Sequence, residues 1–134
     1  MTVFTTVEAD YLDGQLLGRL ATAGADGKPH VVPVSFRYNR ETETIDIGGH
    51  RFGARKKFRD VQENPWAALV VDDLASTDPW TPRMLEVRGR AEALPAGGGA
   101  LGPGFADEMI RIHPARIVAY GLVPDQQSAT ARSV

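Results

Sequence analysis

The chain contains no cysteine among its 134 residues. This absence excludes a disulfide framework, a thiolate zinc site, an iron–sulfur cluster and a cysteine nucleophile. It is typical of proteins in a reducing compartment, and we therefore expect a cytoplasmic protein.

Long hydrophobic runs are absent as well. The longest run, residues 66–71, is far shorter than the roughly 18–20 residues of a membrane-spanning helix. Residues 1–11 carry none of the basic side chains that begin a signal peptide. We therefore expect neither a membrane span nor a secretion signal.

An excess of positive charge is also missing, because 15 Lys and Arg residues face 17 Asp and Glu residues and the net charge is −2. A mildly acidic chain is not expected to bind nucleic acid. The histidines His30, His50 and His113 are too scattered to form a metal-ligand motif. No Gly-x-Ser-x-Gly segment is present, so serine hydrolase chemistry is not supported. We expect no metal, and no catalytic residue is assigned.

What the chain does contain is enough apolar surface for one folded domain, residues 1–134. The apolar share of 43% is ordinary for a globular protein. Alternating apolar and polar residues, and at 66–72 a continuous apolar run of strand length, predict six strands, at 19–23, 30–38, 43–49, 66–72, 83–94 and 115–123. Neighbouring strands joined by short turns favour a mainly β fold: a six-stranded antiparallel sheet closed into a small barrel.

Short helices accompany the predicted strands. Helical spacing of apolar residues predicts helices at 6–17, with Thr6 as the N-cap, and at 53–63. One or two helical turns are predicted at 105–110. Segments 73–82 and 95–104 are predicted loops, and residues 126–134 are predicted to fray.

Basic residues are strongly clustered at one place. Five of the fifteen lie within nine positions, directly after Gly48-Gly49-His50 and at the predicted start of a helix: Arg51, Arg55, Lys56, Lys57 and Arg59. A helix start presents free backbone N–H groups and a positive dipole end, which favour a bound anion and disfavour nearby cations. The cluster therefore indicates a phosphate site. The alternative is a solvated helix face whose cations pair with Asp60 and Glu63.

Two weaker signals point to a ligand. One face of the strand at 30–38 carries Val31, Pro33, Ser35 and Arg37, and a proline inside a strand indicates either an edge facing solvent or a ligand-lined position. Trp80 and Arg83 precede a long strand and are predicted to cover a planar ligand, unless the Trp packs on the surface. The stretch 97–102 matches Gly-x-Gly-x-x-Gly, but no ribose-binding acid follows, and we interpret it as a flexible loop.

Several short motifs occur in a characteristic order. They are Arg19-Leu20-Ala21-Thr22, Asp26-Gly27-Lys28-Pro29, Lys56-Lys57 with Asn64-Pro65, 68–72 and Val87-Arg88-Gly89. This order resembles the pyridoxamine 5′-phosphate oxidase-like split-barrel superfamily, and most of all its short actinobacterial branch that uses the deazaflavin coenzyme F420. Residues 80–89 look like a subgroup that includes a reductase of tetracycline biosynthesis.

The resemblance implies a homodimer with two cofactor sites in grooves at its interface. It implies that Lys57, with Lys56 beside it, contacts the cofactor phosphate, and that the strand after the turn lies along the cofactor ring. The cofactor-binding residues expected from cluster and resemblance together are Val31, Val32, Pro33, Val34, Ser35, Gly49, His50, Arg51, Arg55, Lys56, Lys57, Trp80 and Arg83.

The function implied is an F420-dependent oxidoreductase that transfers a hydride between the reduced cofactor and a small organic acceptor. The polyglutamate tail of F420 suits the additional arginines. The alternatives are an FMN-binding oxidoreductase of the same family and a flavin- or deazaflavin-binding protein without turnover. The long C-terminal extension of true pyridoxamine phosphate oxidases is lacking, so vitamin B6 oxidation is not expected.

Overall fold

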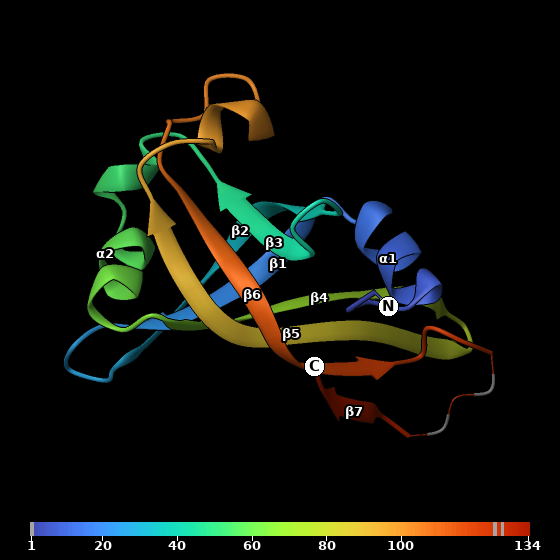
Figure 1. The fold of residues 1–134 in the computed structure, drawn as a ribbon. Coiled ribbons are helices and arrows are strands. Elements are labelled where there is room, and N and C mark those ends of the chain that lie inside the picture. The colour runs from blue at the N-terminus through green and yellow to red at the C-terminus, as the bar shows by residue number, and fades with distance from the viewer. Residues whose placement is uncertain (1, 125, 127) are drawn as a thin grey trace.

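A computed structural model describes residues 2–124, 126 and 128–134. Its strands belong to one antiparallel sheet, accompanied by short helices (Figure 1). The strand order is β3-β2-β1-β4-β5-β6-β7, and β3 also pairs with β6. The strands are β1 (Leu17–Ala23), β2 (Pro29–Asn39), β3 (Thr44–Gly48), β4 (Trp66–Thr77), β5 (Trp80–Leu94), β6 (Met109–Tyr120) and β7 (Thr130–Ser133).

The β3–β6 pairing closes six of these strands into a barrel, as predicted (Figure 1). Strand β6 divides its pairing: residues 110–112 pair with β3, and residues 116–119 pair with β7. The described chain therefore has seven strands rather than six, which is consistent with a split barrel.

The prediction that residues 126–134 fray is wrong for β7. Besides its ladder with β6, this strand is held by Arg132, which donates hydrogen bonds of 2.7 Å to both carboxylate oxygens of the buried Glu8. The polar composition of this segment predicts a frayed tail, because the sequence alone does not show that Arg132 binds Glu8, more than 120 positions away. Residue 127 of the predicted tail lies outside the described residues.

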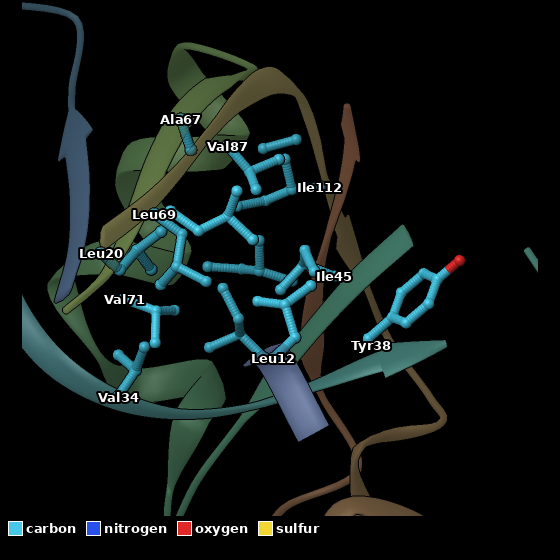
Figure 2. Packing of buried hydrophobic residues seen from close by; sticks show 14 of the residues in the cluster. Leu12, Leu20, Val34, Tyr38, Ile45, Ala67, Leu69, Val71, Val87 and Ile112 are labelled. Atoms are coloured by element: carbon cyan, nitrogen blue, oxygen red, sulfur yellow. The ribbon is translucent and has the colours of Figure 1, made fainter. Parts of the chain in front are cut away.

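The barrel interior is filled by the inward-facing residues of the alternating strands. Figure 2 shows Leu20, Leu69 and Val71 packed against residues of β5 and β6, with Leu12 of the N-terminal helix closing one end. Leu20, Leu69, Val71 and Val87 are fully or almost fully buried. The period-2 pattern thus predicts the core correctly, because successive strand side chains point to opposite faces.

The N-terminal helix α1 (Thr6–Asp13) is shorter than predicted. Thr5, not Thr6, is its N-cap, and it forms a capping box with Glu8. Gly14 ends the helix and β1 begins at Leu17, so the prediction that the helix reaches Leu17 is wrong. Leu16 is 86% exposed and has no place in the core. Within the described part of the chain, no helix has the length and apolar character to cross a bilayer.

The predicted loop at 73–82 is mostly strand. Strands β4 and β5 continue as a hairpin to Thr77 and from Trp80. Pro82 lies opposite Leu74, next to a register shift at which a missing backbone donor is tolerated. The extension is stabilised across the strands by Arg83, whose Nε donates to Asp73 Oδ1 at 2.9 Å. The prolines at 79 and 82 predict a loop, but the pairing of β5 with β4 shows that the segment is a hairpin.

The region before β6 also differs from the prediction. The only helical turn there is η2 (Gly98–Leu101), within the glycine-rich stretch, whereas 105–108 is irregular and β6 begins at Met109. Ala106 donates its backbone N–H to the Gly49 carbonyl at 2.9 Å, which fixes this segment against the end of β3. This bond, together with the pairing of Met109 and Ile110 in β6, replaces the helix expected from apolar spacing.

Gly89 allows β5 to bend, and we predict that Gly89→Ala destabilises the fold. A Cβ at this position would lie 1.8 Å from the His113 backbone carbonyl oxygen, where the β5–β6 register shifts. Because a backbone atom cannot move aside, we expect a loss of about 1–3 kcal/mol in unfolding free energy, measured by urea denaturation. Gly99→Ala, whose Cβ would meet its nearest atom at 3.7 Å, is the matched control. Equal stability of the two variants would contradict the steric argument.

Candidate functional site

A cavity of about 560 Å³ lies where β2 and the end of β3 meet η1 (Phe52–Ala54) and α2 (Lys56–Glu63). Nine of the predicted cofactor residues line it: Val32, Pro33, Val34, Ser35, Gly49, His50, Arg55, Lys56 and Lys57. The structure adds His30, Gly48, Phe52 and Phe105. Residues from three separate parts of the sequence therefore form one site.

The local backbone explains why the basic residues gather at this cavity. Arg51 adopts a left-handed conformation with φ of 53° and leads into η1. Arg55 is extended and serves as the N-cap of α2, so the helix begins at Lys56 and not at 53 as predicted. Among the described residues, no side-chain oxygen caps this helix, and its first turn contains no acid. Free N–H groups and cations thus meet at one helix start.

Lys57 is the cation best placed to receive an anion. Its Nζ lies 5.1 Å from the centroid of the Phe52 ring. Burial, and secondly the charge of Arg55, lower the pKa of Lys57. It forms no ion pair with any residue that the structure describes. A bound anion would offset both unfavourable effects, because it favours the charged amine.

Lys56, in contrast, already has a partner. Its Nζ donates to Oδ1 of Asp60 at 2.9 Å, and Asp60 is buried and also accepts a 2.9 Å hydrogen bond from Thr22 Oγ1. The alternative interpretation, a helix face paired with acids, thus holds for Lys56. It does not hold for Glu63, which accepts from the backbone N–H of Ala25.

The arginines of the cluster bond only to backbone oxygens among the described residues. Arg55 Nε donates to the His50 carbonyl at 3.3 Å, and Arg59 donates to the Ala54 carbonyl at 3.1 Å. Arg51 is exposed and lies outside the lining of the cavity. The cluster therefore keeps unneutralised positive charge at the cavity and beside it.

His50 is held at the rim in a defined orientation. Its Nδ1 lies 2.9 Å from the Gly104 carbonyl oxygen, and its ring meets Phe105 edge to face at 5.2 Å between centroids. Since a carbonyl can only accept, Nδ1 carries the proton. Gly104 has φ of +74°, a conformation that other residues rarely adopt. The sequence contained no signal for the Phe105 contact, which depends on how the loop before β6 packs.

The structure does not bring all the predicted residues together within one chain. Val31 is 64% exposed on the outer face of the sheet. Trp80 and Arg83 line a second cavity of about 710 Å³. Arg83 is engaged by Asp73, and Tyr11 donates to Asp73 Oδ1 at 2.8 Å.

The pKa values of Asp73 and Tyr11, beside the second cavity, agree with a structural ion pair between Asp73 and Arg83. The pKa of Asp73 is lowered, and the hydrogen bond from Arg83 is the largest cause. Burial, followed by the hydrogen bond to Asp73, raises the pKa of Tyr11. The Arg83 guanidinium also lies 5.1 Å from the centroid of the Tyr11 ring. The charge of Arg83 is therefore committed within its own chain.

Within the described residues, no group of three or more His, Asp or Glu side chains is arranged to hold a metal ion. Among polar side chains nearby, His50 lines the first cavity, whereas Arg37 and Tyr38 line a separate depression.

Comparison with known proteins defines the class of protein. The family model described as pyridoxamine 5′-phosphate oxidase matches residues 5–126, and the chain belongs to this family. The chain is 51% identical over 122 residues, 91% of its length and 86% of the relative's, to 5a,11a-dehydrotetracycline/5a,11a-dehydrooxytetracycline reductase of Streptomyces rimosus. The family resemblance predicted from the motifs is thereby confirmed.

Solved structures confirm the fold. A heme binding protein from Mycobacterium smegmatis is similar with a TM-score of 0.70 at 15% identity, over 99% of this chain and 60% of that one. A pyridoxamine 5′-phosphate oxidase-related, FMN binding protein from Nostoc punctiforme is similar with a TM-score of 0.57 at 14% identity, over 89% and 86% of the two chains.

The residues of the first cavity fit the flavin-type cofactor of this family. Lys57 and Arg55 provide two cations without acidic partners among the described residues, which suits a phosphate. Val32, Val34 and Phe52 provide the apolar wall that a planar ring system needs. The donor set therefore matches both chemical parts of such a cofactor.

Proposed function

We propose that this protein is an F420-dependent oxidoreductase that transfers a hydride between the reduced deazaflavin and a small organic acceptor. The family and the 51% identical reductase support an oxidoreductase. The name of that relative supports an unsaturated polycyclic ketone as the class of acceptor. The observation that carries the choice of cofactor is the unneutralised charge around the first cavity, which exceeds what one phosphate requires.

The charge extends beyond the phosphate site. Lys57 and Arg55 line the cavity, while Arg51, before Arg55, and Arg59, after Lys57, are exposed. F420 carries a polyglutamate tail in addition to its phosphate, whereas FMN ends at the phosphate. The carboxylates of a polyglutamate tail can pair with Arg51 and Arg59, whereas FMN has no further anionic group to pair with them.

The chain's own residues bind and orient. Lys57 and Arg55 would hold the phosphate, and Val32–Ser35 of β2 would lie along the ring. Phe52 and Phe105 would exclude water from its edge. When bound, reduced deazaflavin supplies the hydride, and the protein contributes position and a dry environment.

We also propose that the protein acts as a homodimer. The outer face of the sheet carries apolar residues in register, with Val31 opposite Ala21 and Ala21 opposite Ala68. Val31 is 64% exposed. Trp66, two residues before Ala68 and on the same face of β4, is 52% exposed. Pro33 of this face lines the first cavity, so a second copy packed here would border the cofactor site. A two-fold pair buries the same patch on both copies.

The test is direct binding of F420 and FMN to the purified protein, followed by fluorescence at low and moderate salt. We expect tight F420 binding that weakens with salt, weaker FMN binding, and a dimer by sedimentation equilibrium. An Arg51→Gln/Arg59→Gln variant should lose affinity for F420 and keep its affinity for FMN. Tight FMN binding with no binding of F420 would establish the alternative, an FMN-binding member of the family. Tight binding of either cofactor without reduction of any acceptor would indicate a binding protein.

A further inference from the structure

The second cavity lies on the outer face of the sheet, where β4, β5 and β6 lie side by side. Two of its walls follow from strand register: Met84 lies opposite both Asp72 and Tyr120, and Leu74 lies opposite Pro82. Val70 completes an apolar floor. Its volume of about 710 Å³ is in the range of small-molecule sites. The cofactor site described above uses none of these residues.

Trp80 makes this cavity chemically distinctive. It is 69% exposed, at the start of β5 and on the rim of the cavity. An indole is a flat, rigid surface on which a planar ring system stacks with little loss of conformational entropy. A broad aromatic side chain that remains this exposed beside an apolar floor is suited to cover a flat ligand.

The charged groups of the cavity form two ion pairs, Arg19 with Asp72 and Arg83 with Asp73. Arg19 Nη1 lies 2.8 Å from Asp72 Oδ1, and about half of each side chain is exposed. Exposed ion pairs contribute little stability, so Arg19 can donate to a ligand oxygen at small cost. Arg83, by comparison, is committed to Asp73. The cavity therefore offers one available donor, Arg19, beside an apolar floor.

The two cavities adjoin. Arg19 of the second cavity lies directly across the β1–β2 ladder from Pro33, which lines the first. Two neighbouring sites, one for a phosphate-bearing cofactor and one for a flat apolar molecule, are what transfer between a bound cofactor and a second reactant requires.

From these observations we propose that the second cavity binds the acceptor, a planar fused-ring molecule with keto or hydroxyl oxygens on its edge, stacked on Trp80 with Arg19 donating to those oxygens. The role as acceptor site rests on the function proposed above, whereas the binding itself does not. Trp80 is then a specificity-determining residue rather than part of the cofactor site.

The two tryptophans of the chain allow a direct test. Trp66→Phe leaves Trp80 as the only indole, and Trp80→Phe leaves only Trp66. The probe is anthraquinone-2-sulfonate, a flat three-ring quinone, added to cofactor-free protein. We expect it to quench the fluorescence of the Trp66→Phe protein saturably and to have little effect on the Trp80→Phe protein. The compact anion adamantane-1-carboxylate, which cannot stack, should leave both unchanged.

Affinity measurements by calorimetry separate this proposal from the cofactor assignment. Trp80→Ala and Val70→Phe, which respectively remove the stacking surface and fill the floor, should each weaken probe binding at least about fivefold. F420 and FMN titrations of the same variants should match the wild type. Equal quenching of both tryptophans, or wild-type probe affinity in both variants, would overturn the proposal. So would displacement of the probe by either cofactor, which would place the cofactor ring in this cavity.

Discussion

Lys57→Ala is expected to weaken binding of FMN or F420 by about 1–3 kcal/mol, or about 5- to 150-fold. The reason is that Lys57 is partly buried beside Arg55 and has no acidic partner among the described residues, so a phosphate is its natural counter-ion. Removing the amine removes a charge-assisted hydrogen bond in a partly desolvated site.

Fluorescence titration of FMN and riboflavin with wild type and variant checks this expectation. Riboflavin lacks the phosphate, so its affinity should change little. Lys28→Ala, an exposed lysine in the turn between β1 and β2, is the control and should bind both like the wild type. An equal loss for riboflavin and FMN would show that Lys57 supports the ring site or the fold and does not hold the phosphate.

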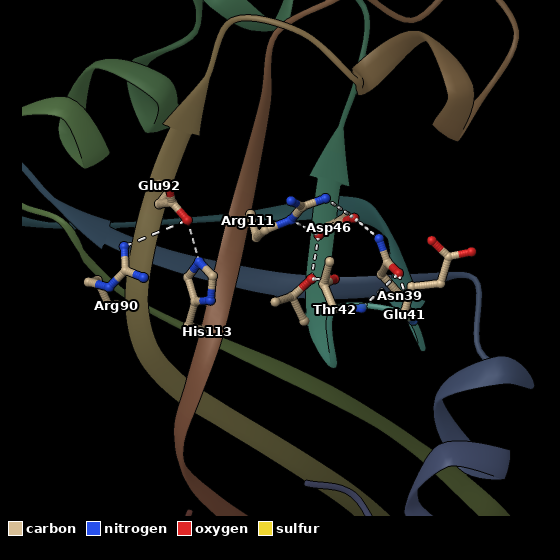
Figure 3. A network of polar contacts seen from close by, with 9 residues as sticks. Asn39, Glu41, Thr42, Asp46, Arg90, Glu92, Arg111 and His113 are labelled. Atoms are coloured by element: carbon tan, nitrogen blue, oxygen red, sulfur yellow. Dashed lines mark hydrogen bonds and ion pairs between the residues drawn. The ribbon is translucent and has the colours of Figure 1, made fainter. Parts of the chain in front are cut away.

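Asp46→Ala is expected to have the largest effect on stability. Asp46 is buried in the middle of β3, where Oδ1 accepts from Arg111 Nε at 2.9 Å and Oδ2 accepts from Asn39 at 3.0 Å (Figure 3). Its partner strand β6 closes the barrel through three residue pairs, of which Asp46 with Arg111 is the central one. Removing one member of a largely buried ion pair leaves the other without its counter-charge.

We expect Asp46→Ala to lower the unfolding free energy by about 2–4 kcal/mol, somewhat less than for a fully buried pair because the Arg111 side chain is 24% exposed. Urea denaturation measures the change. The matched control is Asp72→Ala, which breaks the exposed pair with Arg19 and should cost about 0–1 kcal/mol. A similar small loss in both variants would show that the barrel closes without this ion pair.

The same carboxylate gives the stability a defined pH dependence. Burial by itself would raise the pKa of Asp46, but the hydrogen bonds from Arg111, Asn39 and Thr44 outweigh it and lower this pKa. Since the folded-state pKa is below the unfolded one, the stabilisation is complete above about pH 4 and is lost as the pH falls further. Thermal unfolding of Asp46→Asn should therefore depend less steeply on pH in this acid range. The pKa values of Glu8 and Asp60 are also lowered, so part of the dependence should remain.

Local patterns in the chain were sufficient for the barrel and for the centre of the site. Alternation in β2 and β5 sets which side chains face inward, because a strand has only two faces. Leu85 and Val87 are fully buried as predicted. The clustering of Lys57 with Arg55 after two glycines predicted a helix start rich in positive charge, and the structure places both at one cavity.

Contacts between different segments of the chain decided the remainder. The pairing of β7 with β6, the Arg83–Asp73 bond that extends the β4–β5 hairpin, and the packing of Phe105 against His50 each join segments whose own composition suggested a loop, a tail or a helix. A polar or proline-containing segment becomes a strand when a neighbouring backbone supplies its hydrogen bonds, and propensity does not record that neighbour.

The sequence by itself determined the fold class, the family and the positive charge of the first cavity, since these follow from residue types and their spacing. Only the tertiary structure decided which cations remain unpaired. Asp60 neutralises Lys56 and leaves Lys57 without an acidic partner among the described residues. The tertiary structure also placed Trp80 and Lys57 in two adjoining cavities rather than one. The physical reason is that burial and ion pairing are properties of a folded surface, where side chains from different strands meet.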